Sequence, residues 1–181
     1  SLRATFPGVA IDWATEEAFV PLVAAHPYVR QALSINLKEM KKGWKNWGVW
    51  KKCFSFFATL RKSRYDVLFD LQGNCKSGFV TLLSKARMKV GLGLQSVREK
   101  PNVLFTHRRF EVSKQKNIRE QYVELARAFF QTQGFALQTP PRERGGVKFR
   151  ISPAEQEQIR QIFVHPALQT HLKIMVCPGS Q

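Results

Sequence analysis

Short apolar runs alternate with amphipathic stretches along this chain, and this alternation constrains the fold more than any other feature. The clearest run, Tyr65–Leu71, is continuously apolar from Val67 to Phe69, which is typical of a strand covered on both faces. Further strands are expected at Val9–Ala14, Val29–Ile35, Met88–Leu92 and Leu172–Cys177. With helices between them, these strands predict an α/β protein with an open, doubly wound, mostly parallel sheet.

Helix signals fill the segments between the expected strands. Thr15–Glu17 opens a helix with acidic residues in its first turn, and that helix should end before Pro27. Asn117–Gln133 is strongly amphipathic and is followed by Gly134, a common helix stop. Its expected apolar face consists of Ile118, Tyr122, Leu125, Ala126 and Phe129. Ser152–Glu155 matches a capping box with proline at the first helical position. Further helices are expected over the second half of Lys38–Arg64 and over Lys76–Lys85.

One stretch, Pro140–Gly146, is linker-like in composition. It predicts two domains, residues 1–145 and residues 146–181. The chain starts at Ser1 in helix-like residues and stops in the turn Pro178–Gln181, directly after a strand-like run. The fold is therefore expected to be truncated at both ends.

The net charge of +16 and the sequence pI of about 10.3 favour a polyanionic partner. Nucleic acid, an anionic membrane surface and phosphorylated small molecules all fit, and charge alone does not choose among them. No metal-type spacing joins the cysteines, which are interpreted as free, buried thiols at Cys53, Cys75 and Cys177. Neither a dinucleotide fingerprint nor a P-loop is present, so no metal or cofactor is expected.

The segment Lys38–Arg64 carries nine basic residues and one acid, with tryptophan and phenylalanine interleaved. Three interpretations stay open. The segment could be a solvated basic face with core aromatics, or a contact for an anionic ligand or membrane surface. Stacking on nucleic-acid bases is the third, although no nucleic-acid-binding motif accompanies it.

Two loops should follow strands at the carboxyl edge of the sheet, where ligands bind in such folds. The first contains Asp70, Gln72, Gly73 and Lys76. Gly73 permits a tight turn, and Lys76 would add its charge to the free N–H groups of a helix start, making an anion site. Alternatively, Asp70 caps the turn and Lys76 is merely solvated. The second loop contains Gly179 and Ser180.

The residues Tyr65–Ser77 resemble the pattern YD-x-x-x-D-x-QG-x-x-KS of the lipopolysaccharide heptosyltransferase family. Gln95–Glu99 is similar to the family's Ala-Arg-Glu-Pro element, and Leu37–Trp44 resembles its basic Arg-Arg-Trp-Arg-Lys-x-Trp loop. These stretches occur in the family's order, and the resemblance spans nearly the whole chain.

The resemblance implies a two-domain glycosyltransferase of the GT-B type. Residues 1–145 would be the acceptor-side, Rossmann-like N-terminal domain without its first strand, and residues 146–181 the start of the nucleotide-sugar-binding domain. The implied reaction moves L-glycero-D-manno-heptose from ADP-heptose to a Kdo residue of the lipopolysaccharide inner core. The implied place is cytoplasmic and peripheral on the inner membrane of a Gram-negative bacterium. The implied partners are ADP-heptose, Kdo-lipid A and the anionic membrane surface, but not nucleic acid.

Carried over by position, the acceptor-binding residues would be Lys38, Lys41, Lys42 and Arg98. The loop Asp70–Lys76 would line the site, and Gly179 and Ser180 would lie on the nucleotide side. The family's general base and leaving-group residues fall outside this sequence, so no catalytic residue is assigned and the chain alone is expected to be inactive. A sibling transferase with another sugar or acceptor, and a non-catalytic basic binding module, remain alternatives.

Overall fold

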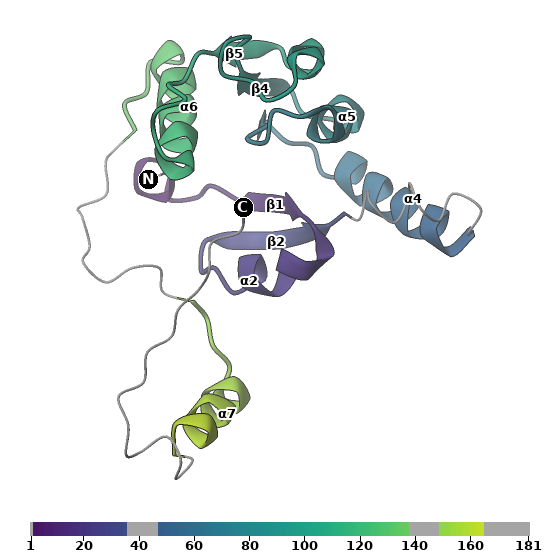
Figure 1. The fold of residues 1–181 in the computed structure, drawn as a ribbon, viewed down its shortest axis with the longest axis vertical. Helices are drawn as coiled ribbons and strands as arrows, with labels where there is room; N and C mark the ends of the chain where they lie inside the picture. The colour runs from purple at the N-terminus through teal and green to yellow at the C-terminus, as the bar shows by residue number, and fades with distance from the viewer. Residues whose placement is uncertain (1, 36–46, 138–148, 165–181) are drawn as a thin grey trace.

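The structure is a computed structural model that describes residues 2–35, 47–137 and 149–164. Figure 1 shows its helices and strands in chain order. They are α1 (Leu2–Thr5), β1 (Ile11–Thr15), η1 (Glu17–Phe19), α2 (Val20–Ala24), β2 (Val29–Ser34), α4 (Trp47–Lys62), β3 (Val67–Phe69), α5 (Cys75–Leu83), β4 (Met88–Leu92), η2 (Lys100–Phe105), β5 (Arg108–Phe110), α6 (Ile118–Thr132) and α7 (Pro153–Val164).

The strands form two parallel sheets. One has the order β1-β2 and the other β3-β4-β5, and every pairing is parallel. Within the described residues, β1 and β3 each pair on one edge only and do not pair with each other. In each sheet the strands follow one another in chain order, starting from β1 or from β3, as in the two halves of a doubly wound sheet. The predicted open α/β class is therefore confirmed.

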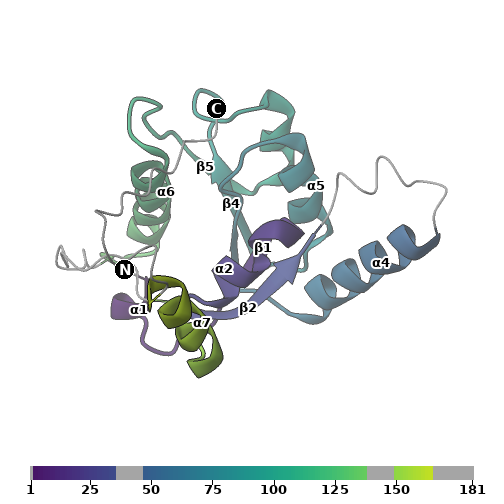
Figure 2. The same ribbon diagram turned by 60° about the horizontal axis from the view of Figure 1, so that its bottom comes forward.

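The larger core lies between the β3-β4-β5 sheet and α6. Val90 and Leu92 of β4 pack with Leu125 and Phe129 of α6, and all four side chains are buried. The ring of Phe129 meets that of Phe69 in β3 edge-on, with centroids 5.5 Å apart. Figure 2 shows α6 and α5 on opposite sides of β4 and β5, the arrangement that parallel strands require.

A smaller core joins α4 to β2. Its buried members are Leu33 of β2 and Phe56 and Leu60 of α4. The four-residue spacing places Phe56 and Leu60 on one face of the helix, as the amphipathic pattern predicts. One helical face is therefore committed to the core, and α4 otherwise extends away from the body of the molecule (Figure 1).

An aspartate in β1 links the two sheets. The Arg30 guanidinium of β2 donates to both carboxylate oxygens of Asp12, at 2.8 and 2.5 Å, and the Tyr65 hydroxyl donates to Oδ2 at 2.9 Å. Tyr65 lies just before β3, so this carboxylate bridges β1, β2 and the entry to the second sheet. The Asp12 side chain is only 2% exposed. Its pKa is lowered, chiefly by the hydrogen bond from Arg30.

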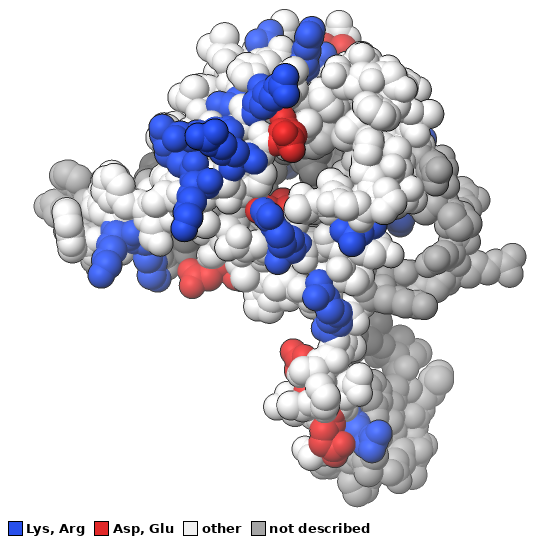
Figure 3. Space-filling view, turned by 180° about the vertical axis from the view of Figure 1, so that it is seen from behind, with Lys and Arg blue, Asp and Glu red and all other residues white. Residues whose placement is uncertain are grey.

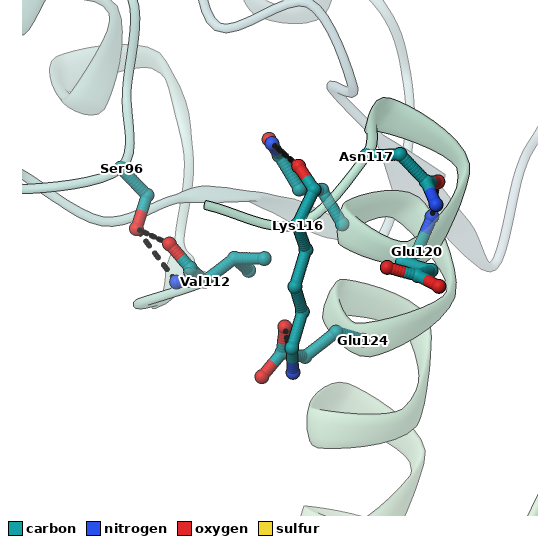
Figure 4. Close-up of polar contacts among 7 residues, drawn as sticks. Ser96, Val112, Lys116, Asn117, Glu120 and Glu124 are labelled. Atoms are coloured by element: carbon teal, nitrogen blue, oxygen red, sulfur yellow. Dashed lines mark hydrogen bonds and ion pairs between the residues drawn. The ribbon is translucent and has the colours of Figure 1, made fainter. Parts of the chain in front are cut away.

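The connection from β5 into α6 is held by short polar contacts (Figure 4). Ser96 Oγ accepts from the Val112 amide at 2.6 Å and donates to the Val112 carbonyl at 2.8 Å. Asn117 caps α6, its Oδ1 accepting from the Glu120 amide at 3.0 Å. These contacts explain why the helix begins where the sequence predicts.

Most of the expected elements are present, and three details differ. Strand β3 is half-buried rather than covered on both faces, because its edge away from β4 has no strand partner among the described residues. Ile118 was expected on the apolar face of α6 but is exposed. Strand β5 and the 3₁₀ helix η2 were not predicted. The described residues include no helix long and apolar enough to cross a membrane.

Several expectations lie outside the described residues. They concern Lys38, Lys41 and Lys42, the linker Pro140–Gly146, the strand Leu172–Cys177, and the loop residues Gly179 and Ser180.

The close packing of α5 on η2 depends on Gly78. A Cβ there would overlap the Phe105 ring and lie 2.9 Å from Asn102 Nδ2, and Asn102 is fully buried. Gly78→Ala is expected to lower the free energy of unfolding by about 1–3 kcal/mol, despite alanine's better helix propensity. Urea denaturation measures this. Gly8→Ala, where a Cβ meets open space, should change stability by less than about 0.5 kcal/mol. Equal losses in the two variants would contradict the packing argument.

The Asp12 bridge predicts a pH dependence of stability. A folded-state pKa below the ordinary value of 3.8 contributes stability that is present above that pH and is lost as the pH falls below it. Asp12→Asn should cost about 1.5–3 kcal/mol near neutral pH, and the cost should shrink as both proteins are acidified below pH 3.8. Thermal unfolding across pH measures this, with the exposed Asp66→Asn as the control. A cost that stayed constant into acid would contradict the assignment.

Candidate functional site

The loop after β3 is built around the carboxylate of Asp70. Its Oδ1 accepts from the amides of Gln72 and Gly73, both at 3.1 Å. Its Oδ2 accepts from Ser77 Oγ at 3.0 Å and from Asn102 Nδ2 at 2.7 Å. The residue is 3% exposed, so these four donors replace the water that an ionised carboxylate requires. Asp70 therefore shapes the turn, as one of the two interpretations of the sequence held.

Gly73 and Asn74 turn the chain from the strand into α5. Gly73 has φ +63°, the left-handed conformation that favours glycine, as the expected tight turn requires. Asn74 then caps α5, its Oδ1 accepting from the Ser77 amide at 2.9 Å, while Ser77 Oγ accepts from the Asn74 amide. The start of α5 is thereby fixed beside the carboxyl end of β3.

An acidic side chain accepts a hydrogen bond from the first amide of α5. Glu99 Oε2 accepts from the Cys75 amide at 2.7 Å, and the Glu99 amide donates to the Gly73 carbonyl at 2.9 Å. The sequence predicted free N–H groups beside Lys76, and this is wrong for the Cys75 amide, which donates to Glu99. A carboxylate is favoured there by the helix dipole. An anionic ligand at this end of α5 would compete with Glu99.

The charges around Glu99 are coupled. Its pKa is lowered by the hydrogen bond from the Cys75 thiol, then by the Cys75 amide, with smaller contributions from the charges of Lys76 and Arg98. The pKa of the Cys75 thiol is correspondingly raised by its hydrogen bond to Glu99. Cys75 is exposed rather than buried, contrary to the expectation from sequence. The cluster Cys75, Lys76, Arg98 and Glu99 is solvent-exposed and open to a ligand.

The backbone of Arg98 passes directly under the turn. A Cβ on Gly73 would lie 3.3 Å from the Arg98 amide, so the two segments are in close contact. On the α6 side, burial raises the pKa of Tyr122, with an opposing contribution from the charge of Arg98 and a reinforcing one from Asp70. Arg98 thus lies where the turn and α6 approach each other.

The structure brings together five of the residues predicted for the site: Asp70, Gln72, Gly73, Lys76 and Arg98. The other five lie outside the described residues: Lys38, Lys41, Lys42, Gly179 and Ser180. Sequence analysis missed Glu99 and Asn102, which hold the loop from 24 or more positions away. The sequence feature that could have pointed to Glu99 is the place of Gln95–Glu99 directly after the next strand, and no pattern pointed to Asn102.

Basic side chains are spread over the face seen in Figure 3, and acidic ones are sparse on it. No three His, Cys, Asp or Glu residues in the described part of the chain are grouped so as to hold a metal ion. The arrangement is therefore suited to recognising an anionic group with lysine and arginine.

The family model and the most similar curated proteins indicate the same family. The model described as "Glycosyltransferase family 9 (heptosyltransferase)" matches residues 53–181. Lipopolysaccharide heptosyltransferase 1 of Escherichia coli (strain K12) is 28% identical over 119 residues, which are 66% of this chain and 37% of that protein. The Pseudomonas aeruginosa protein of the same name is 26% identical over 162 residues, 88% of this chain and 44% of its own length.

Two solved structures are also similar. "E. coli heptosyltransferase WaaC with ADP" superposes with a TM-score of 0.69 at 27% identity, covering 80% of this chain and 43% of that one. The same enzyme with ADP-2-deoxy-2-fluoro heptose gives 0.66 at 28% identity, covering 79% and 44%. The chain thus spans less than half the length of the relatives it matches.

The Cys75–Glu99 contact predicts a change in thiol reactivity. Because the carboxylate raises the Cys75 pKa, Glu99→Gln should lower that pKa and increase the thiolate fraction at neutral pH. Alkylation of Cys75 by iodoacetamide should speed up severalfold, read by peptide mass spectrometry. The Cys53 peptide of the same samples is the internal control, since burial alone raises its pKa. An unchanged Cys75 rate would show that the hydrogen bond does not form in solution.

Proposed function

Because the chain belongs to glycosyltransferase family 9, the heptosyltransferases of lipopolysaccharide biosynthesis, we propose that the protein transfers L-glycero-D-manno-heptose from ADP-heptose to a Kdo residue of the inner core. The observation that carries this proposal is the pair Lys76 and Arg98 beside one loop at the carboxyl end of β3. Such a sheet edge is where α/β folds bind ligands. The solved relative was determined with ADP and with an ADP-heptose analogue, which supports a nucleotide-sugar donor.

The acceptor proposed here is anionic, since Kdo carries a carboxylate and lipid A carries phosphates. Arg98 and the lysines Lys38, Lys41 and Lys42 are proposed to bind these groups through charge-assisted hydrogen bonds. Gly179 and Ser180 are proposed to lie on the nucleotide side. Phosphorylation of the acceptor adds charge to the same interaction.

The transfer needs a base for the acceptor hydroxyl and positive charge for the departing diphosphate. Asp70 is poorly suited to be the base, because it is buried and its two oxygens already accept four hydrogen bonds. Its role is to position the loop. We therefore assign no catalytic residue within these 181 residues.

The proposed domain division places residues 1–145 on the acceptor side and residues 146–181 in the nucleotide-sugar-binding domain. Among the described residues, β1 and β3 each have one edge without a strand partner, which supports a further parallel strand between them that would join the two sheets into one. Arg150 lies just after the proposed junction. Its guanidinium donates to the carbonyls of His26, Pro27 and Val29 at 3.1–3.3 Å, which ties the chain after the linker to the α2–β2 turn.

The proposed site of action is the cytoplasmic face of the inner membrane of a Gram-negative bacterium, where the protein would be peripheral. A lipid-anchored acceptor requires the enzyme to work at that surface. The basic charge of the chain fits an anionic leaflet.

The direct test uses the full-length protein that contains this sequence, with ADP-heptose and a soluble Kdo-containing lipid A analogue. Heptose transfer, followed by mass spectrometry, is the expected result. In the variant Lys41→Ala/Lys42→Ala/Arg98→Ala, the KM for the acceptor should rise about tenfold or more, since three exposed charged contacts, each worth up to about 1 kcal/mol, are lost together. The KM for ADP-heptose should change much less.

The control variant removes the same charge elsewhere: Lys85→Ala/Lys114→Ala/Arg119→Ala, all exposed positions. Equal effects of the two variants would mean that overall charge, and not this site, attracts the acceptor. Transfer of a different sugar, or to a different position, would instead identify a sibling transferase of the family. No transfer with any donor, together with steeply salt-dependent binding to generic oligonucleotides, would favour a basic binding module.

A further inference from the structure

Helix α4 exposes a row of large aromatic side chains. Trp47 is 80% exposed, Phe54 67% and Trp50 39%, and the rings of Trp50 and Phe54 are 6.4 Å apart. The spacing of three and four residues places all three on one side of the helix. Phe56 and Leu60, which enter the small core, lie on the opposite side. The exposed row is therefore not part of the packing that holds α4 to β2.

The apolar surface continues onto α5. Phe79 and Leu82 are 45% and 50% exposed and lie one turn apart on that helix. The half-buried Phe57 of α4 meets Phe79 edge-on, with ring centroids 6.0 Å apart, so the two helices are in contact here. Contiguous exposed apolar surface of this kind usually marks an interaction site.

Positive charge flanks the aromatic row. The sequence of α4, WGVWKKCFSFFATLRK, contains no acidic residue. Its basic residues are Lys51, Lys52, Arg61 and Lys62, all exposed. By helical periodicity, Lys51 and Lys62 lie along one side of the aromatic row. Arg61 continues the line of the row toward the C-terminal end of the helix, and Lys52 lies on the opposite side. No acidic residue of α4 neutralises these cations, whereas Glu99 lies close to Lys76 and Arg98.

We propose that α4 is the element that docks this protein on an anionic phospholipid surface, with Trp47 and Phe54 inserted at the level of the headgroups. A helix with aromatic residues on one side and lysine and arginine beside them lies in the plane of such an interface. Tryptophan favours that region, and basic residues add attraction to anionic lipid. Figures 1 and 2 show α4 standing out from the body, so a flat surface can reach it.

The proposal rests on the proposed function only in its choice of a bilayer as the physiological surface. The aromatic row itself belongs to the structure whatever the reaction is. A nucleic acid would use the same residue types, with bases stacking on the exposed rings. The row favours lipid because a 16-residue helix presents its aromatics along one line beside its cations, the pattern of an interfacial helix.

The test is flotation of the protein with vesicles of phosphatidylcholine alone and with 30 mol% phosphatidylglycerol (about the anionic content that basic helices respond to). The expected result is binding to the anionic vesicles that falls about tenfold or more in Trp47→Ser/Phe54→Ser. Leu104→Ser is the matched control, because Leu104 is 77% exposed on η2, away from α4. Lys51→Gln/Lys62→Gln should weaken binding more than Lys114→Gln/Arg119→Gln, which removes equal charge from other exposed positions.

Insertion has its own readout. Lipids brominated near the headgroup should quench part of the tryptophan fluorescence of the parent protein, and less of it in Trp47→Phe. Circular dichroism checks that each variant is folded, and Trp47→Phe keeps the helix aromatic should the double serine variant unfold. Unchanged vesicle binding and quenching in the folded variants would overturn the proposal. So would a loss of oligonucleotide binding in Trp47→Ser/Phe54→Ser while vesicle binding persists.

The same proteins separate this inference from the proposed reaction. Full-length Trp47→Ser/Phe54→Ser should still transfer heptose to a soluble, delipidated Kdo acceptor, with impaired transfer only to acceptor embedded in vesicles. Transfer to both acceptors at parent rates would overturn docking through α4 and leave the reaction standing. Vesicle binding without any heptose transfer would overturn the reaction and leave the docking surface standing.

Discussion

The carboxylate of Asp70 is the interaction on which the second sheet and its edge depend. A buried negative charge is costly unless several donors surround it, and here the turn, α5 and η2 each supply one or more. Removing the carboxylate would leave the two turn amides without this acceptor, and Asn102 Nδ2 would keep only the Asn74 carbonyl. The fully buried Asn102 already has one oxygen, Oδ1, with no hydrogen-bond partner among the described residues. The network therefore has little tolerance for a second loss.

Because the Asp70 carboxylate is buried and hydrogen-bonded within the loop, exposed side chains would supply the ligand contacts in the proposed site. Lys76 and Arg98 are the exposed cations there. Glu99 lies between them and occupies the first amide of α5. To bind there, a ligand carboxylate or phosphate must attract these cations more strongly than the Glu99 carboxylate does. Such competition favours ligands with several negative charges over those with one.

The sequence predicted those parts of the fold whose determinants are local. The apolar run at Val67–Phe69, the amphipathic helix that starts near Asn117 and the capping box at Ser152 require only neighbouring residues, and each appears in the structure. Strand β5 could not be anticipated, because Arg108–Phe110 is short and mostly basic and becomes a strand by pairing with β4. Its pairing is a tertiary effect that overrides local propensity.

The same division applies to the site. The turn Asp70–Lys76 was visible as a pattern, and so was Arg98 by resemblance. The capture of the Cys75 amide by Glu99 was not, because the two residues are 24 positions apart. Spacing can place a lysine at a helix start, but only the fold shows which carboxylate reaches the same amides. The sequence likewise did not show that β1 and β3 belong to two separately paired sheets, because pairing between distant strands leaves no pattern in the sequence of either strand.

The excess of positive charge is arranged in two different ways, and the difference bears on how a lipid-anchored acceptor could be bound. At the site, exposed cations beside Glu99 can contribute only modestly, since surface ion pairs are worth about 0–1 kcal/mol each. On α4, which has no acidic residue, three of the four cations lie beside the exposed rings or in line with them. In the proposed arrangement, docking through α4 would confine the protein to the surface that holds the acceptor. Binding of the acceptor then becomes nearly intramolecular, and its effective concentration compensates for a weak, exposed site.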